Sequence, residues 1–83
     1  MTDETREELA KAFADRLNMI KNDIDVTSRD IERATGIPHS CIGVWTRGGI
    51  LPNTYSLIRL EKYFGVTTDW LLGLSDEMGM RSE

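Results

Sequence analysis

The chain has a single cysteine, Cys41, and a single histidine, His39, among its 83 residues. One cysteine cannot form an internal disulfide bond, and two potential ligands without partners are too few for a metal site. A glycine-rich phosphate loop, a Ser/His/Asp set and paired metal ligands are missing as well. The sequence therefore predicts no enzyme, no cofactor and no metal, and we expect Cys41 to be a small, partly buried apolar side chain.

Long apolar runs and a surplus of positive charge are also missing. No run approaches the ~20 residues that cross a bilayer, and the acidic residues 1–13 do not resemble a secretory signal, so we expect a cytoplasmic protein without a membrane partner. The net charge of −4 counts against nucleic-acid binding, because phosphate contacts need cations. However, residues 16–62 carry seven basic and five acidic residues, and a local patch matters more than the total.

The first half of the chain contains three predicted helices. Apolar residues recur at helical spacing from Leu9 to Ile20, which predicts an amphipathic helix from about residue 5 to about residue 22. Thr27 resembles the start of a capping box and begins a second helix, which Gly36 ends in the left-handed conformation. Pro38 suits the first turn of a third helix, which extends to about residue 47.

Two further helices complete the predicted architecture. Turn residues at 51–54 precede a fourth helix that ends at Gly65, and Thr67 or Thr68 begins a short fifth helix. No segment shows the alternation of a strand. The sequence predicts an all-α fold of five helices in a single domain over residues 1–74, followed by a solvated C-terminal tail over residues 75–83.

The most informative segment covers residues 27–48, where two short helices meet at a glycine. A glycine at this position allows a sharp turn, so the second helix can project from the first. One face of the pair is apolar and predicts core positions, which are Ile31, Ala34, Ile37, Ile42 and Trp45. The opposite face of the second helix is small and polar, as a helix in the major groove of DNA requires; its residues are His39, Ser40, Gly43 and Val44.

The chain resembles the lambda-repressor and Cro-like family of helix-turn-helix domains (the XRE family) from Phe13 to Leu74. The matching segments are FADRLNMIK, VTSRDIERATGIPHSCIGVWTRG, LP and LIRLEKYFGVTTDWLLG. The resemblance implies a five-helix DNA-binding domain in which the helix-turn-helix covers about residues 27–48. It implies base readout by His39, Ser40, Gly43 and Val44. It also implies phosphate contacts near the groove, at Lys21, Ser28, Arg29 and Pro38.

Several residues depart from the family pattern. Glu32 and Glu61 stand where the family commonly has alanine, so Glu32 must point outward or find a partner between the two motif helices. Pro38 replaces the usual serine or threonine cap. Thr46 stands where the family often has a glutamate, so a possible partner for Lys21 is missing. The connection at residues 48–51 is uncharged where the family is often basic.

Three assignments keep two interpretations each. His39 either reads DNA or is an ordinary surface histidine. Arg47 either contacts phosphate or favours the negative end of its helix. In the fifth helix, Trp70 and Leu72 form a dimer contact, or Leu71 and Leu74 close the core and no dimer contact is needed.

The resemblance implies a sequence-specific regulator that binds double-stranded DNA, acting as a homodimeric repressor on a palindromic operator. It implies no small-molecule ligand. Phage or prophage Cro-like regulators, antitoxins and restriction-modification control proteins are equally compatible with the sequence. The alternative is a protein-interaction module on the same scaffold, which sequesters a partner regulator through its apolar fifth helix.

Overall fold

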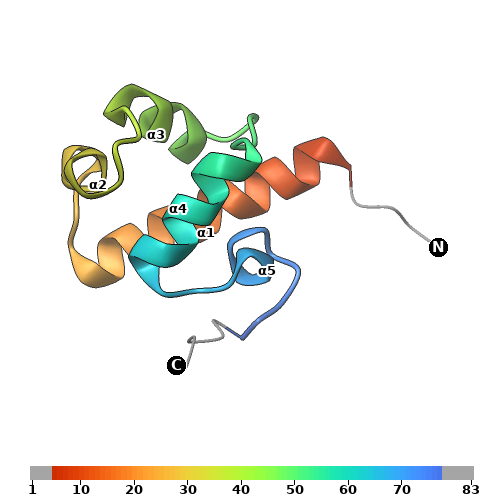
Figure 1. Ribbon diagram of the computed structural model, residues 1–83. Helices are drawn as coiled ribbons and strands as arrows, with labels where there is room; N and C mark the ends of the chain where they lie inside the picture. The colour runs from red at the N-terminus through yellow and green to blue at the C-terminus, as the bar shows by residue number, and fades with distance from the viewer. Residues whose placement is uncertain (1–4, 78–83) are drawn as a thin grey trace.

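A computed structural model describes residues 5–77, and all the regular secondary structure in this part of the chain is helical, with no strand (Figure 1). The prediction of an all-α chain with five helices is confirmed over these residues. Short connections join the helices, which follow one another in chain order as α1 (Arg6–Ile24), α2 (Ser28–Thr35), α3 (His39–Thr46), α4 (Thr54–Phe64) and α5 (Thr68–Leu71).

Local capping residues determine where the helices begin. Thr27 and Asp30 form a full capping box at α2, with the backbone N–H of Asp30 donating to the Thr27 hydroxyl at 3.1 Å. Asn53 caps α4, and Thr67 caps α5 by accepting from the Trp70 N–H. Such caps satisfy N–H groups that the first turn leaves without a partner. The local sequence therefore places most helix starts to within a residue or two.

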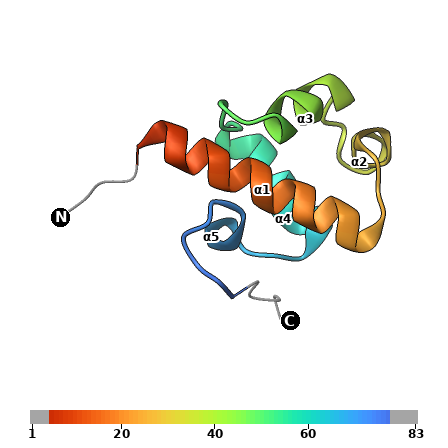
Figure 2. The same ribbon diagram turned by 180° about the vertical axis from the view of Figure 1, so that it is seen from behind.

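The helices enclose one apolar core. The core lies between α1 and the other helices, because α1 contacts both α3 and α5, and α4 contacts both α2 and α5. Figures 1 and 2 show α3 and α5 on opposite sides of α1 and α4. Phe13 of α1 meets Trp45 of α3 edge to face, with ring centroids 5.9 Å apart. This contact attaches α3 to the longest helix, so α3 has a firmly held inner face.

Several expected positions differ in the structure. One interpretation of the fifth helix placed Trp70 in a dimer contact, but its side chain is only 3% exposed and belongs to the core. Leu72 is partly buried and packs against the same core. In the other interpretation Leu71 and Leu74 close the core; Leu71 is fully buried there, whereas Leu74 is 51% exposed. Ala34 and Cys41, expected to be buried and partly buried, are both exposed.

The segment after α5 contacts α1 where a solvated tail was expected to begin. The Arg16 guanidinium lies 4.7 Å from the centre of the Trp70 ring. It also donates to the Ser75 carbonyl at 3.3 Å and to the Asp76 carboxylate at 3.2 Å. Arg16 thus connects α1, α5 and the following residues, which explains how a short helix can bury a tryptophan. The rest of the expected tail, residues 78–83, lies outside the described residues.

Candidate nucleic-acid interface

The turn between α2 and α3 is fixed by local hydrogen bonds. Gly36 has a φ of +81°, as expected for a left-handed cap, and its N–H donates to the Glu32 carbonyl at 2.8 Å. The buried Thr35 hydroxyl donates to the Ile31 carbonyl at 2.7 Å and accepts from the Ile37 N–H at 3.1 Å. Ile37 itself is 5% exposed and joins the core. The turn therefore holds α3 in one direction relative to α2, which is seen almost end-on in Figure 1 while α3 crosses the view.

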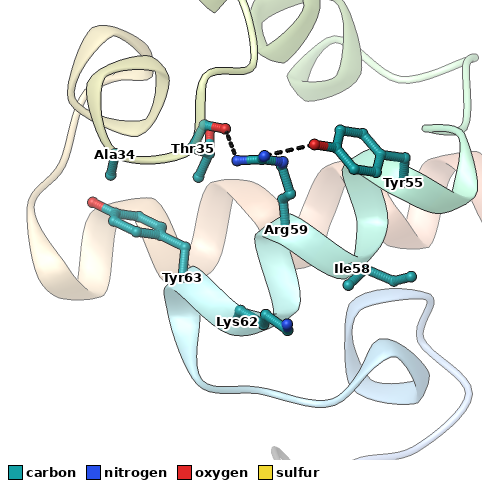
Figure 3. Close-up of a pocket in the computed structure, with 7 residues that line it drawn as sticks. All are labelled: Ala34, Thr35, Tyr55, Ile58, Arg59, Lys62 and Tyr63. Atoms are coloured by element: carbon teal, nitrogen blue, oxygen red, sulfur yellow. Dashed lines mark hydrogen bonds between the residues drawn. The ribbon is translucent and has the colours of Figure 1, made fainter.

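Arg59 of α4 holds the end of α2 from the other side (Figure 3). Its guanidinium donates to the Thr35 carbonyl and to the Tyr55 hydroxyl, and it lies 4.8 Å from the Tyr55 ring centre. A cation suits this place because the last carbonyls of a helix carry partial negative charge. These residues border a hollow of about 440 Å³ between α2 and α4.

Glu32 provides the start of α3 with the cap that Pro38 lacks. No side chain at Pro38 caps the helix, and Pro38 precedes α3 instead of lying in its first turn. The Glu32 Oε1 atom accepts from the His39 backbone N–H at 3.3 Å and lies 2.7 Å from His39 Nδ1. The side-chain hydrogen bond with His39, followed by the backbone one, lowers the pKa of Glu32 below 4.5. Glu32 thus has the partner that its place between the motif helices requires.

Glu61 performs the same task seven residues before α5 begins. Its Oε2 atom accepts from the Thr68 N–H at 3.2 Å and from the Thr68 hydroxyl at 3.4 Å. In each case the glutamate carbonyl also accepts from a left-handed glycine four residues later, at Gly36 and at Gly65. The two glutamates that depart from the family pattern therefore share one structural role, which is to connect a helix with the start of the next.

The outer face of α3 carries the residues expected to read bases. Ser40 is exposed, and Gly43 and Val44 are partly exposed, whereas Ile42 and Trp45 on the inner face are 0% and 6% exposed. A Cβ atom built on Gly43 would lie 3.8 Å from the Arg47 guanidinium, which is ordinary contact. Arg47 thus lies beside Gly43, and the outer face has a cation next to its smallest residue.

Two of the expected phosphate contacts meet at the start of α2. Lys21 Nζ, from α1, donates to the Ser28 hydroxyl at 2.9 Å. Arg29, in the first turn of α2, and Pro38, just before α3, are both exposed. Lys21 therefore brings a positive charge to the N-terminus of α2, where the helix N–H groups already favour an anion.

Other contacts at this face were not expected from the sequence. The Asn18 side-chain amide donates to the Ala14 and Thr46 carbonyls, each at 3.0 Å, and so attaches the end of α3 to α1. The Thr46 hydroxyl donates to the Gly43 carbonyl at 2.8 Å. Asn18 and Arg59 carry no local signal of these roles, because their partners lie 28 and 24 residues away in the chain. The capping role of Glu32 and Glu61, in contrast, has a signal in the sequence, because each glutamate is followed four residues later by a helix-ending glycine, Gly36 or Gly65.

Comparisons with known proteins give no further guide: no family model, no curated protein and no solved structure matches the chain. Within residues 5–77, no helix has both the length and the apolar character needed to cross a membrane. The same residues contain no group of three or more His, Cys, Asp or Glu side chains that could hold a metal ion.

Proposed function

We propose that this chain is a sequence-specific DNA-binding regulator with a lambda repressor-like helix-turn-helix formed by α2 and α3. The observation that carries the proposal is the outer face of α3. It is small and polar, it has an adjacent cation at Arg47, and it belongs to a helix held rigidly by Glu32, Gly36 and Trp45. A rigid helix with such a face suits the major groove, because close approach of the backbone brings short side chains to the base edges.

Three residues of the outer face have distinct roles in this proposal. Ser40 donates to or accepts from a base edge, and Val44 contacts a thymine methyl group. Gly43 has no side chain, so α3 approaches the bases closely there. Because its backbone is an ordinary helical one with space beside it, a larger residue at Gly43 affects DNA approach and not folding.

The phosphate contacts position the protein on the duplex. Lys21 and Ser28 act together at the start of α2, and Arg29, Pro38 and Arg47 contact the backbone on either side of the groove. We propose a homodimeric repressor, because two copies can bind half-sites about 34 Å apart on a palindromic operator. The buried Trp70 takes no part in that dimer.

The test is selection of random duplex DNA on the purified protein, followed by binding measurements on variants. We expect a palindromic consensus. Ser40→Ala and Val44→Ala each cost roughly 1–3 kcal/mol on that site and relax preference at one position per half-site. Ser56→Ala on α4 makes the same chemical change as Ser40→Ala and leaves preference unchanged.

Gly43→Glu adds bulk and negative charge and abolishes specific binding, while its melting temperature stays near that of the unmodified chain. Ser40 and Val44 variants that stay folded and keep full preference contradict the assignment of α3 as the recognition helix.

A second candidate is an interaction module on the same scaffold. It is favoured by exposed apolar side chains on α4, where Tyr55 is 65% and Ile58 is 43% exposed beside the hollow of Figure 3. The same selection separates the two functions. Absence of any enriched DNA at about 50–100 mM salt, where phosphate contacts still hold, favours the interaction module.

A further inference from the structure

The start of α3 has a specific arrangement around the His39 ring. One carboxylate oxygen of Glu32 lies 2.7 Å from Nδ1 and also accepts the backbone N–H of the same residue. The second ring nitrogen, Nε2, has no hydrogen-bond partner among residues 5–77 and is not buried. His39 thus has one edge bound to the protein and the other free to meet a ligand.

The chemistry of a carboxylate determines which ring nitrogen carries hydrogen. An ionised carboxylate only accepts hydrogen bonds. Glu32 is ionised at neutral pH, since its hydrogen bonds with His39 lower its pKa. Nδ1 must therefore be the donor. A neutral imidazole has a single N–H, so Nε2 then carries a lone pair and can only accept.

We propose that Glu32 is a positioning residue that holds His39 in its Nδ1–H form, so that Nε2 accepts a hydrogen bond from the amino group of a base. This inference rests on the proposed DNA-binding function. In the major groove, hydrogen-bond donors occur only on adenine N6 and cytosine N4. His39 therefore reads adenine or cytosine. At guanine or thymine, Nε2 would face another acceptor on the base and would have no hydrogen-bond donor.

Two variants of Glu32 separate its charge from its hydrogen bond. Glu32→Gln keeps an oxygen at this position, and the His39 backbone N–H, which needs an acceptor there, turns that oxygen and not the NH2 group toward the ring. The amide oxygen then accepts from Nδ1–H as the carboxylate does, and we expect the form of the ring to be retained. Glu32→Ala removes the acceptor, and the ring is then free to adopt either neutral form. A purely structural role of Glu32 as a helix cap changes stability in Glu32→Ala, but it does not predict which base is preferred.

The first measurement is the nitrogen-15 NMR spectrum of the unmodified protein at about pH 8, which distinguishes a protonated from an unprotonated ring nitrogen. We expect a protonated Nδ1 and an unprotonated Nε2, with the same pattern in Glu32→Gln and a mixture in Glu32→Ala. A hydrogen found on Nε2 of the unmodified protein overturns the proposal. This result needs no variant to fold and no DNA to bind.

The second measurement is DNA selection at the same pH for the unmodified protein, both Glu32 variants and His39→Ala. The position whose preference is lost in His39→Ala is the one that His39 reads. We expect adenine or cytosine there by about fivefold, as one hydrogen bond provides. Glu32→Gln keeps this preference, and Glu32→Ala reduces it toward onefold.

Guanine or thymine at that position overturns the proposal even when the ring has the expected form. Failure to enrich any DNA overturns the proposed function and the base assignment together. In that case the NMR result still decides separately whether Glu32 fixes the form of the His39 ring.

Discussion

At the scale of single residues, the space beside a glycine Cα atom determines whether the fold tolerates a larger residue there. Gly73, just after α5, has a φ of +76°. A Cβ atom built there would lie 2.6 Å from the Cβ of Ala12 on α1, far inside normal contact. Gly65 has a similar φ of +74° but nothing within 4 Å of the same atom. A residue with a Cβ atom would therefore be strained at both positions, and only at Gly73 would it also clash.

We expect Gly73→Ala to be clearly more destabilising than Gly65→Ala. Both substitutions place a Cβ at positive φ, which costs on the order of 1 kcal/mol. Gly73→Ala must also displace Ala12, which adds roughly 1–3 kcal/mol, as overpacking does. Denaturant unfolding measures both, and Ala12→Gly in the Gly73→Ala background should recover part of the difference. Equal losses in the two single variants would contradict the contact between Gly73 and α1.

The exposure of single residues was the least predictable property of the chain. The apolar periodicity correctly indicated that Trp45 lies in the core, because α3 has a clear inner face. Trp70 belongs to a helix of four residues, too short for periodicity to assign a face. Its burial depends on Arg16, which lies over the ring and binds the segment after α5. That partner is more than 50 residues away, and no local pattern indicates it.

At the scale of helices, signals within a few residues predicted the architecture well. The capping box at Thr27 and the left-handed Gly36 marked the limits of α2. These signals succeed because they satisfy the terminal N–H and carbonyl groups of a helix within a few residues. The start of α3 was less predictable, since its cap comes from Glu32 in the preceding helix.

The Glu32 cap predicts a specific dependence of stability on pH. Because folding lowers the pKa of Glu32 below 4.5, this group stabilises the fold above that pH and loses its contribution as pH falls through the lower, folded value. Glu32→Gln cannot titrate there. We expect it to melt at a lower temperature than the unmodified chain at neutral pH, with a smaller further decrease between about pH 6 and pH 3.

Asp30 contributes in the same direction through its hydrogen bonds to Thr27, so some pH dependence remains in Glu32→Gln. Asp30→Asn with Glu32→Gln should therefore flatten the profile further. Melting followed by circular dichroism over this range measures both effects. Parallel profiles for Glu32→Gln and the unmodified chain would show that Glu32 titrates alike in the folded and unfolded states.

At the scale of the whole molecule, charge separates the proposed DNA-binding face from the rest of an acidic protein. The net charge is −4, and the first turn of α1 contributes Glu7 and Glu8. The candidate phosphate contacts include only three cations, which are Lys21, Arg29 and Arg47. Glu32 lies among them at the start of α3, where it acts as a cap. A protein arranged in this way holds DNA with few phosphate contacts and depends more on base readout.

This arrangement predicts a weak dependence of DNA affinity on salt. Few neutralised phosphates release few counterions, so the slope of log K against log salt should be about −3 to −5 per dimer. Lys21→Ala should weaken binding about equally for specific and scrambled duplexes and make the slope less steep by about 2 per dimer.

Lys11→Ala removes the same charge about 15 Å away along α1, where Lys11 pairs with Asp15 at 3.3 Å. It should change neither the slope nor the affinity much, because that pair is exposed and lies away from α2. Titrations of each protein on the selected site at several salt concentrations give these slopes. A change of sequence preference in Lys21→Ala, or an equal change of slope in Lys11→Ala, would remove Lys21 from the phosphate contacts.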